Sequence, residues 1–289
     1  MKGSFAPIAD VGITEIYCPA SNVTPVADIV FVHGLMGHPQ DTWLYGKFPK
    51  AQPTATHKEN VQKRSILQKV FGSNKSAGEK PDLSSRKSDE NEKYCFWPYH
   101  LLPKDDTISH ARILLYGYNS EPTNFYKIAT NRMTISQHAN DLLHRVTRVR
   151  VQDPNRPLIF IAHSLGGIIV KRALIESRDT LRQADQNLLL SCRGIIFMGT
   201  PHLGADIASW GEIMSNIVGA IPGAFSTYSG ILRGLKLDSE ILELTSTGFN
   251  RILEQATSGR NRIQICSVQE GLGMSSVKGA GSKVCFTYT

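Results

Sequence analysis

The sequence has little of what builds disulfide frameworks or metal sites, and it has no long apolar run. Its five cysteines are scattered through 289 residues, odd in number and without metal-ligand spacing. This argues against a disulfide framework and favours a reducing compartment. No stretch approaches the roughly 18 consecutive apolar residues of a membrane-spanning helix, and the N-terminus lacks the apolar core of a signal peptide. We therefore expect an intracellular protein, in which any membrane contact is peripheral or depends on residues absent from this chain.

Positive charge is concentrated in one polar segment. The formal net charge of the chain is +7, which on its own favours an anionic partner. Residues 47–93, however, hold 11 Lys and Arg against 6 Asp and Glu, with few large apolar residues. Only two residues of this segment, Phe48 and Phe71, are aromatic, and the signs of its charges are mixed. We therefore predict a solvated, disordered basic insertion at about 47–93 and expect no nucleic-acid partner.

Apolar runs alternate with helical patterns along the rest of the chain, which predicts an α/β fold with a mostly parallel sheet and helices on both faces. The length fits a single domain over 1–289, with an atypical tail at about 271–289 that forms no closing strand. Strands are expected at 12–17, 27–34, 111–118, 157–162, 193–200 and 262–268. Apolar residues at helical spacing predict helices over 135–149, 165–175 and 237–252.

Ser164 follows a buried strand and precedes an apolar helix in "IFIAHSLGGIIV" (159–170). A nucleophilic serine on such a turn needs small residues two positions before and after it, so that strand and helix can approach. Ala162 and Gly166 stand at these positions. A simple serine helix cap does not require small residues on both sides. We predict that Ser164 is a catalytic nucleophile.

A second segment supplies donors for an oxyanion, which acyl transfer generates and which preorganised N–H groups must stabilise. In this architecture one donor is the amide of the residue after the nucleophile, here Leu165. The other comes from the loop after an early strand, here Leu35, with Met36 as the alternative. His33 in the same loop is expected to brace it rather than to act as a base.

Four segments stand out along the chain: "FVHGLMGHPQDTW", "FWPYHLLPKDDTISHARILLYGYNS", "IFIAHSLGGIIVKRAL" and "GIIFMGTPHLGAD". Taken together, they resemble the serine esterase and lipase-like α/β-hydrolases, in particular the serine-active-site-containing protein family. They also resemble the N-terminal hydrolase-like domain of fungal NACHT and ankyrin proteins. The resemblance implies an α/β-hydrolase fold, hydrolysis or transfer of a carboxylic ester of lipid type, and an association with mitochondria and endoplasmic reticulum membranes; otherwise the protein is cytoplasmic. Acyl transfer needs neither a metal nor an organic cofactor, so none is expected.

The same resemblance implies an acid after the strand at 262–268 and a histidine near the end of the chain. Glu270 stands where the acid is expected, with Asp206 as the alternative. The last histidine is His202, and 87 residues follow it. A serine without its base is a poor nucleophile near neutral pH, so we expect weak or no activity in this chain, and we interpret its C-terminus as truncated or alternatively spliced.

Three hypotheses stay open. In the first hypothesis the chain is an esterase or lipase-like enzyme that lacks the segment with the histidine. In the second, His202 or His33 substitutes for that base. In the third hypothesis the domain is a non-catalytic signalling or interaction module of a larger protein.

Overall fold

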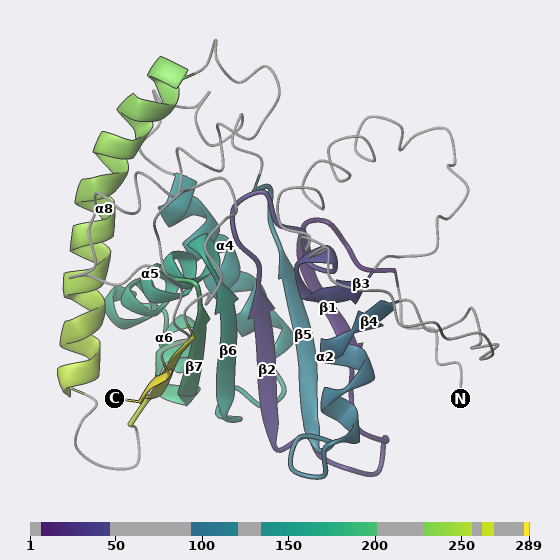
Figure 1. The fold of residues 1–289 in the computed structure, drawn as a ribbon. Coiled ribbons are helices and arrows are strands. Elements are labelled where there is room, and N and C mark those ends of the chain that lie inside the picture. The colour runs from purple at the N-terminus through teal and green to yellow at the C-terminus, as the bar shows by residue number, and fades with distance from the viewer. Residues whose placement is uncertain are drawn as a thin grey trace, which may run out of the picture.

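A seven-stranded sheet forms the centre of the computed structural model, with strand order β1-β5-β2-β6-β7-β8-β9 (Figure 1). β2, β5, β6, β7 and β8 run parallel, whereas β1 is antiparallel to β5 and β9 is antiparallel to β8. The strands are β1 (Gly12–Tyr17), β2 (Ala27–Val32), β5 (Ala111–Gly117), β6 (Leu158–His163), β7 (Cys192–Met198), β8 (Gln264–Val268) and β9 (Phe286–Tyr288). The structure describes residues 7–46, 94–120, 134–200, 228–255, 262–268 and 286–288.

Helices lie on both faces of this sheet (Figure 1). One face carries α4 (Thr134–Val149), α5 (Leu165–Asp179) and α6 (Gln183–Ser191), and the long helix α8 (Tyr228–Gln255) contacts α5. The other face carries α2, next to a small two-stranded sheet and two short 3-10 helices. These elements are α2 (Trp97–His100), β3 (Leu44–Gly46), β4 (Tyr94–Phe96), η1 (Asp41–Trp43) and η2 (Leu102–Lys104).

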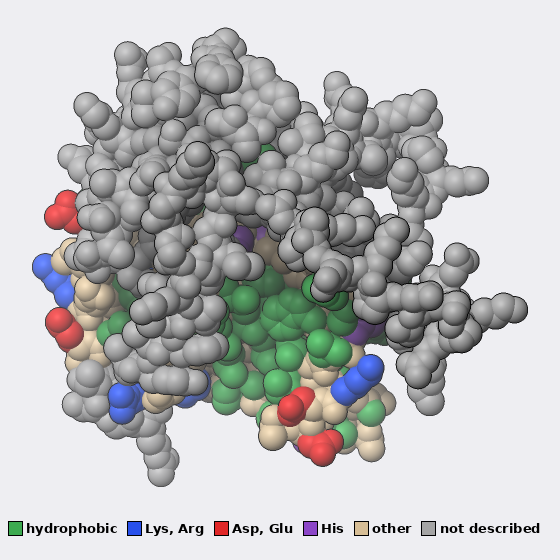
Figure 2. All heavy atoms as spheres, viewed as in Figure 1, with side chains coloured by type: hydrophobic (Ala, Val, Ile, Leu, Met, Phe, Trp, Pro, Cys, Tyr) green, Lys and Arg blue, Asp and Glu red, His purple; other side chains and the backbone are tan. Residues whose placement is uncertain are grey.

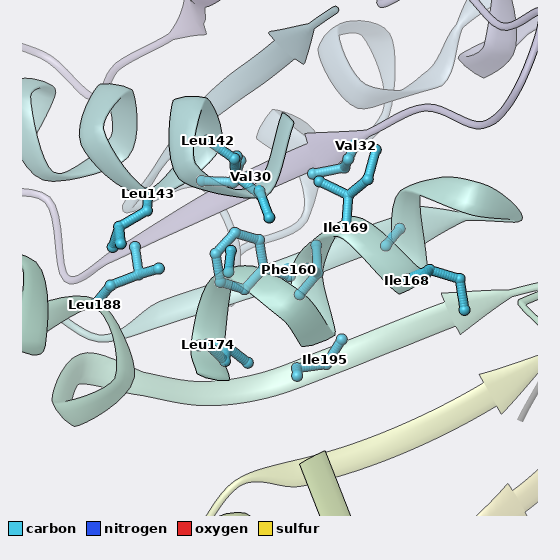
Figure 3. Close-up of a cluster of buried hydrophobic side chains, with 14 of the residues drawn as sticks. Val30, Val32, Leu142, Leu143, Phe160, Ile168, Ile169, Leu174, Leu188 and Ile195 are labelled. Atoms are coloured by element: carbon cyan, nitrogen blue, oxygen red, sulfur yellow. The ribbon is translucent and has the colours of Figure 1, made fainter. Parts of the chain in front are cut away.

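Alternate residues of the central strands enter two separate apolar clusters, one on each face. In β2, Val30 and Val32 join the cluster under α4 and α5, whereas Ile29 and Phe31 join the cluster under α2. Figure 3 shows the first cluster, in which Phe160 of β6 lies among side chains of the helices and of the neighbouring strands. Because both faces are packed, the strands are nearly continuous apolar runs, as the sequence predicted.

The two faces differ in how completely the described residues cover them. From the side that carries α2, apolar side chains gather over the middle of the sheet (Figure 2). Ile159, Ile196 and Met198 belong to this face and are only half-buried, whereas Phe160 and Phe197, which point to the other face, are fully buried.

A buried ion cluster ties together the amino-terminal ends of the parallel strands. Asp28 of β2 is fully buried and accepts from Arg112 Nε of β5 at 2.7 Å, from Arg156 at 3.1 Å and from Arg150. Arg150 and Arg156 lie in the segment between α4 and β6. The cluster therefore stabilises the end of the sheet at which the parallel strands begin. The loops that follow the strands, including the Ser164 turn, lie at the opposite end.

The α/β-hydrolase fold predicted from the sequence is confirmed by a mostly parallel sheet with an antiparallel β1 and a Ser164 turn between β6 and α5. All six predicted strands are present. The prediction of no closing strand was wrong for 286–288, because this short run of β-forming residues pairs with β8 as β9. The predicted insertion, and the rest of the predicted tail, lie outside the described residues. Within the described chain, no helix has an apolar stretch able to cross a bilayer.

Candidate active site

Ser164 occupies the sharp turn between β6 and α5 with φ 50° and ψ −121°, a backbone conformation that is strained for a residue with a side chain. Two hydrogen bonds hold it to the end of β7 and to the residues just after that strand. The Ser164 amide donates to Met198 O at 2.8 Å, and Thr200 Oγ1 donates to Ser164 O at 3.1 Å. The side chain is half-buried and makes no cap hydrogen bond with α5. The simple helix-cap interpretation is therefore excluded.

Glycines let α5 approach the end of β2. A Cβ added at Gly166 would lie 2.4 Å from His33 O and 2.5 Å from Val32 O. A Cβ at Gly34, in the loop after β2, would lie 2.9 Å from the Ser164 Cβ. This loop and the Ser164 turn are therefore packed backbone to backbone, which brings the amides of the loop close to the serine.

Two amides at this junction match the predicted oxyanion donors. Leu165 is the first residue of α5, so its N–H has no partner within the helix. Among the described residues, the Leu35 amide makes no hydrogen bond either. The amide of Met36, the alternative donor, is already used, since it donates to Ser120 O at 2.9 Å. The geometry therefore favours Leu35 and Leu165, and their role stays a prediction.

His33 is a structural brace beneath the loop, as expected from the sequence. The ring is fully buried and stacks on Tyr118 with centroids 4.3 Å apart. Its Nε2 accepts from the Tyr118 amide at 3.3 Å, so its Nδ1 carries the proton and donates to Gly34 O at 3.0 Å. Burial lowers the pKa of His33 to about 3. With both nitrogens engaged, His33 does not serve as the base for Ser164.

The structure also places a histidine–aspartate pair, His38 and Asp10, near the carboxyl-terminal ends of the parallel strands, which the sequence analysis did not identify. His38 Nε2 lies 2.9 Å from Asp10 Oδ1, while its Nδ1 accepts from the amides of Gln40 and Asp41 at 3.2 and 3.3 Å. The ring therefore ties the segment before β1 to the loop after β2. Asp10 and His38 are 28 residues apart, so no local pattern signals this pair.

No general base for Ser164 is found in the described part of the chain. There, the Ser164 hydroxyl makes no hydrogen bond to a histidine or to any other side chain. His163 precedes the serine, and its ring faces Trp43 edge-on with centroids 6.4 Å apart. His202 and the two acid candidates, Glu270 and Asp206, lie outside the described residues, so their roles stay predictions. No group of three or more His, Cys, Asp or Glu in the described chain forms a metal site.

Comparison with known proteins gives a partial match. No family model matches the chain. The chain is similar to SERAC1 proteins. It is 28% identical over 186 residues to Protein SERAC1 of Bos taurus and 26% identical over 185 residues to that of Homo sapiens. Each alignment covers 64% of this chain and 23% of the relative, so the chain spans about a quarter of the length of the curated relatives it matches. This similarity supports a hydrolase-like family, whereas the resemblance to NACHT and ankyrin proteins stays a prediction.

Similar solved structures are enzymes that act on esters or thioesters. Bacillus licheniformis lipase BlEst2 has 15% identity and a TM-score of 0.39, covering 88% of this chain and 70% of that chain. YbtT, a type II thioesterase from a yersiniabactin biosynthetic pathway, has 14% identity and a TM-score of 0.35, covering 88% and 77%. These scores are low, so the fold assignment depends on the strand order and the Ser164 turn.

Proposed function

We propose that this chain carries the nucleophile and the oxyanion site of a serine-dependent carboxylic-ester hydrolase or acyltransferase. The observation that supports it is the strained Ser164 turn, which presents a hydroxyl without a hydrogen bond in the described chain, beside the amides of Leu35 and Leu165. Ser164 Oγ would attack the ester carbonyl while both amides stabilise the oxyanion. The alcohol then leaves, and water or a second acceptor takes the acyl group from Ser164.

We infer a lipid ester as the substrate class, and with it a peripheral contact with a mitochondrial or endoplasmic reticulum membrane. The support is the sequence resemblance described above, which implies a lipid-type ester and an association with these membranes. Leu35 and Met36, the apolar side chains of the oxyanion loop, lie half-buried next to the Ser164 turn and suit an acyl chain. Glu270, or Asp206 as the alternative, is proposed as the acid that would orient a catalytic histidine.

A second candidate function is a non-catalytic signalling or interaction module that keeps the hydrolase fold. The observation in its favour is that no histidine in the described chain is hydrogen-bonded to Ser164. In a serine hydrolase, losing the histidine costs about 10⁶-fold in turnover. We therefore expect this chain to react with a strong electrophile far more readily than it turns over an ester.

A fluorophosphonate probe tests the proposal. Incubation of the protein with the probe, followed by peptide mass spectrometry, should give one adduct on Ser164. The S164A variant should give none, and S109A, which removes a hydroxyl away from the site, should label like the unmodified protein. If Ser164 stays unlabelled after prolonged exposure at high pH while the fold is intact, the interaction module is favoured and the hydrolase proposal fails.

A further inference from the structure

The two proposed oxyanion donors belong to peptide groups whose carbonyls are hydrogen-bonded in the same way. The Leu165 N–H shares its peptide plane with Ser164 O, which accepts from Thr200 Oγ1 at 3.1 Å and from the Gly167 amide at 3.0 Å. The Leu35 N–H shares its plane with Gly34 O, which accepts from His33 Nδ1 and from the Gly37 amide, both at 3.0 Å. Each carbonyl thus accepts one side-chain and one backbone donor.

These bonds act on the N–H at the other end of each peptide. A hydrogen bond accepted by a peptide oxygen polarises the whole amide group and strengthens its N–H as a donor, because bonds in a chain reinforce one another. Two donors at one oxygen also fix the orientation of the peptide plane. An amide that is already fixed needs no reorganisation when negative charge develops in front of it.

Thr200 is placed for this contact by backbone features of its own. It is 8% exposed and follows Gly199, whose φ of 59° turns the chain after β7 and whose amide donates to Val268 O at 2.8 Å. Gly167 leaves room for it, since a Cβ added there would lie 2.2 Å from Thr200 Oγ1. The hydroxyl is therefore held against the Ser164 peptide from the side of β7 and β8.

We propose that Thr200 is a positioning residue for the Leu165 amide: its hydroxyl fixes and polarises the Ser164–Leu165 peptide and so makes Leu165 N–H a stronger oxyanion donor. The inference rests on the proposed function for its catalytic meaning. In this role Thr200 acts on the Ser164–Leu165 peptide rather than on the substrate. The corresponding contact on the Leu35 side is made by the neutral His33 ring.

Two variants separate the hydroxyl of Thr200 from its shape. T200V keeps the volume that fills the space above Gly167 but removes the donor, and T200S keeps the donor but removes the methyl group. The first measurement does not depend on activity. In protein labelled with ¹⁵N-leucine, the Leu165 amide resonance should move upfield in T200V and return towards its original position in T200S. Thermal unfolding of both variants verifies that each is folded.

The second measurement is the rate constant for Ser164 phosphonylation by a fluorophosphonate. We expect T200V to react roughly 10-fold more slowly, a smaller loss than the roughly 10²–10³-fold for deleting an oxyanion donor, and T200S to recover most of the rate. An unchanged Leu165 resonance in T200V, or an equal shift in T200S, would overturn the inference. If the resonance shifts as expected while even the unmodified protein forms no Ser164 adduct, the proposed function fails and the effect of Thr200 on the peptide stands.

Discussion

Close contacts between backbone segments determine which positions around Ser164 can carry a side chain. Ser164 itself keeps a conformation that costs on the order of 1–3 kcal/mol for a non-glycine residue. The hydrogen bonds at its amide and its carbonyl, and the packing of α5 on β2, offset this cost. A stable protein keeps such strain where the surroundings enforce it, which is typical of catalytic turns.

At Gly166 this packing leaves no room for a side chain. In G166A the added methyl group would meet the carbonyl oxygens of His33 and Val32 at 2.4 and 2.5 Å, and backbone atoms cannot move aside as a flexible side chain can. We expect a loss of about 3 kcal/mol in the free energy of unfolding, measured by chemical denaturation, together with loss of Ser164 labelling.

Gly194 of β7 provides the matched control. A Cβ added there meets no atom closer than 3.8 Å, so G194A should be as stable as the unmodified protein or slightly more stable, because alanine is less flexible than glycine in the unfolded chain. Equal stability of G166A and G194A would show that α5 does not rest on the end of β2 as described.

Helix α5, which follows the Ser164 turn, contains a lysine that is buried in the core. Lys171, in the middle of the helix, is 2% exposed. Its Nζ lies 5.1 Å from the centroid of the Phe197 ring in β7 and 5.7 Å from that of Phe249 in α8. Rings stabilise a cation placed over their faces, yet burial lowers the pKa of Lys171 to about 8. The desolvation of the ammonium group is the cause of this lowered pKa.

This lowered pKa predicts a pH-dependent stability. Between pH 8 and about 10.4 the unfolded chain binds the Lys171 proton and the folded chain does not, so stability rises with pH in this window. We expect K171M to be more stable than the unmodified protein by about 3 kcal/mol at pH 7, with the difference closing as the pH rises from 8 towards 10. Denaturation at several pH values measures it.

Lys104 provides the comparison, because it is an exposed lysine in η2. K104M should leave the stability unchanged between pH 7 and pH 10. A constant difference between K171M and the unmodified protein from pH 7 to pH 10 would mean that Lys171 titrates as in water.

Elements with a local signal were predicted from the sequence, and elements that depend on distant partners were not. The strands β2, β5, β6 and β7 and the start of α5 follow from apolar runs and from the spacing around Ser164. The pairing of β3 with β4 was not predicted, because residues 44–46 and 94–96 are far apart in the chain. Helix α6 was also missed, since its pattern is weakly amphipathic and includes the buried Asp185.

The same distinction holds for the candidate site. The Ser164 turn and its small residues were predicted because their steric reason lies within a few positions of Ser164. Thr200 is 36 residues further along the chain, and its contact with the Ser164 peptide depends on β7 lying beside β6. No pattern in the sequence around Thr200 specifies that contact, so the contact emerged only from the structure.

In the molecule as a whole, the buried ion cluster and the candidate site lie at opposite ends of the parallel strands. At their amino-terminal ends, the buried Asp28 and its three arginines fix the sheet. At their carboxyl-terminal ends lie Ser164, the loop with Leu35 that we propose as an oxyanion donor, and Thr200. This follows the general rule that ligands bind beyond the carboxyl ends of strands in open α/β sheets. Proton transfer is the one part of the proposed chemistry for which the described residues at that end supply no group.

The pH profile of Ser164 phosphonylation tests whether residues outside the described part of the chain supply a general base for Ser164. Without a histidine base, hydroxide or water must take the proton, so the rate should rise about tenfold per pH unit through pH 6–9 and should increase with added imidazole. A histidine base would instead give a plateau above a pKa of about 6.5. A plateau that disappears in H202A would contradict our expectation and assign the base to His202, which the sequence left as an open alternative. The control, H110A, changes an exposed histidine remote from Ser164 and should leave the profile unaltered.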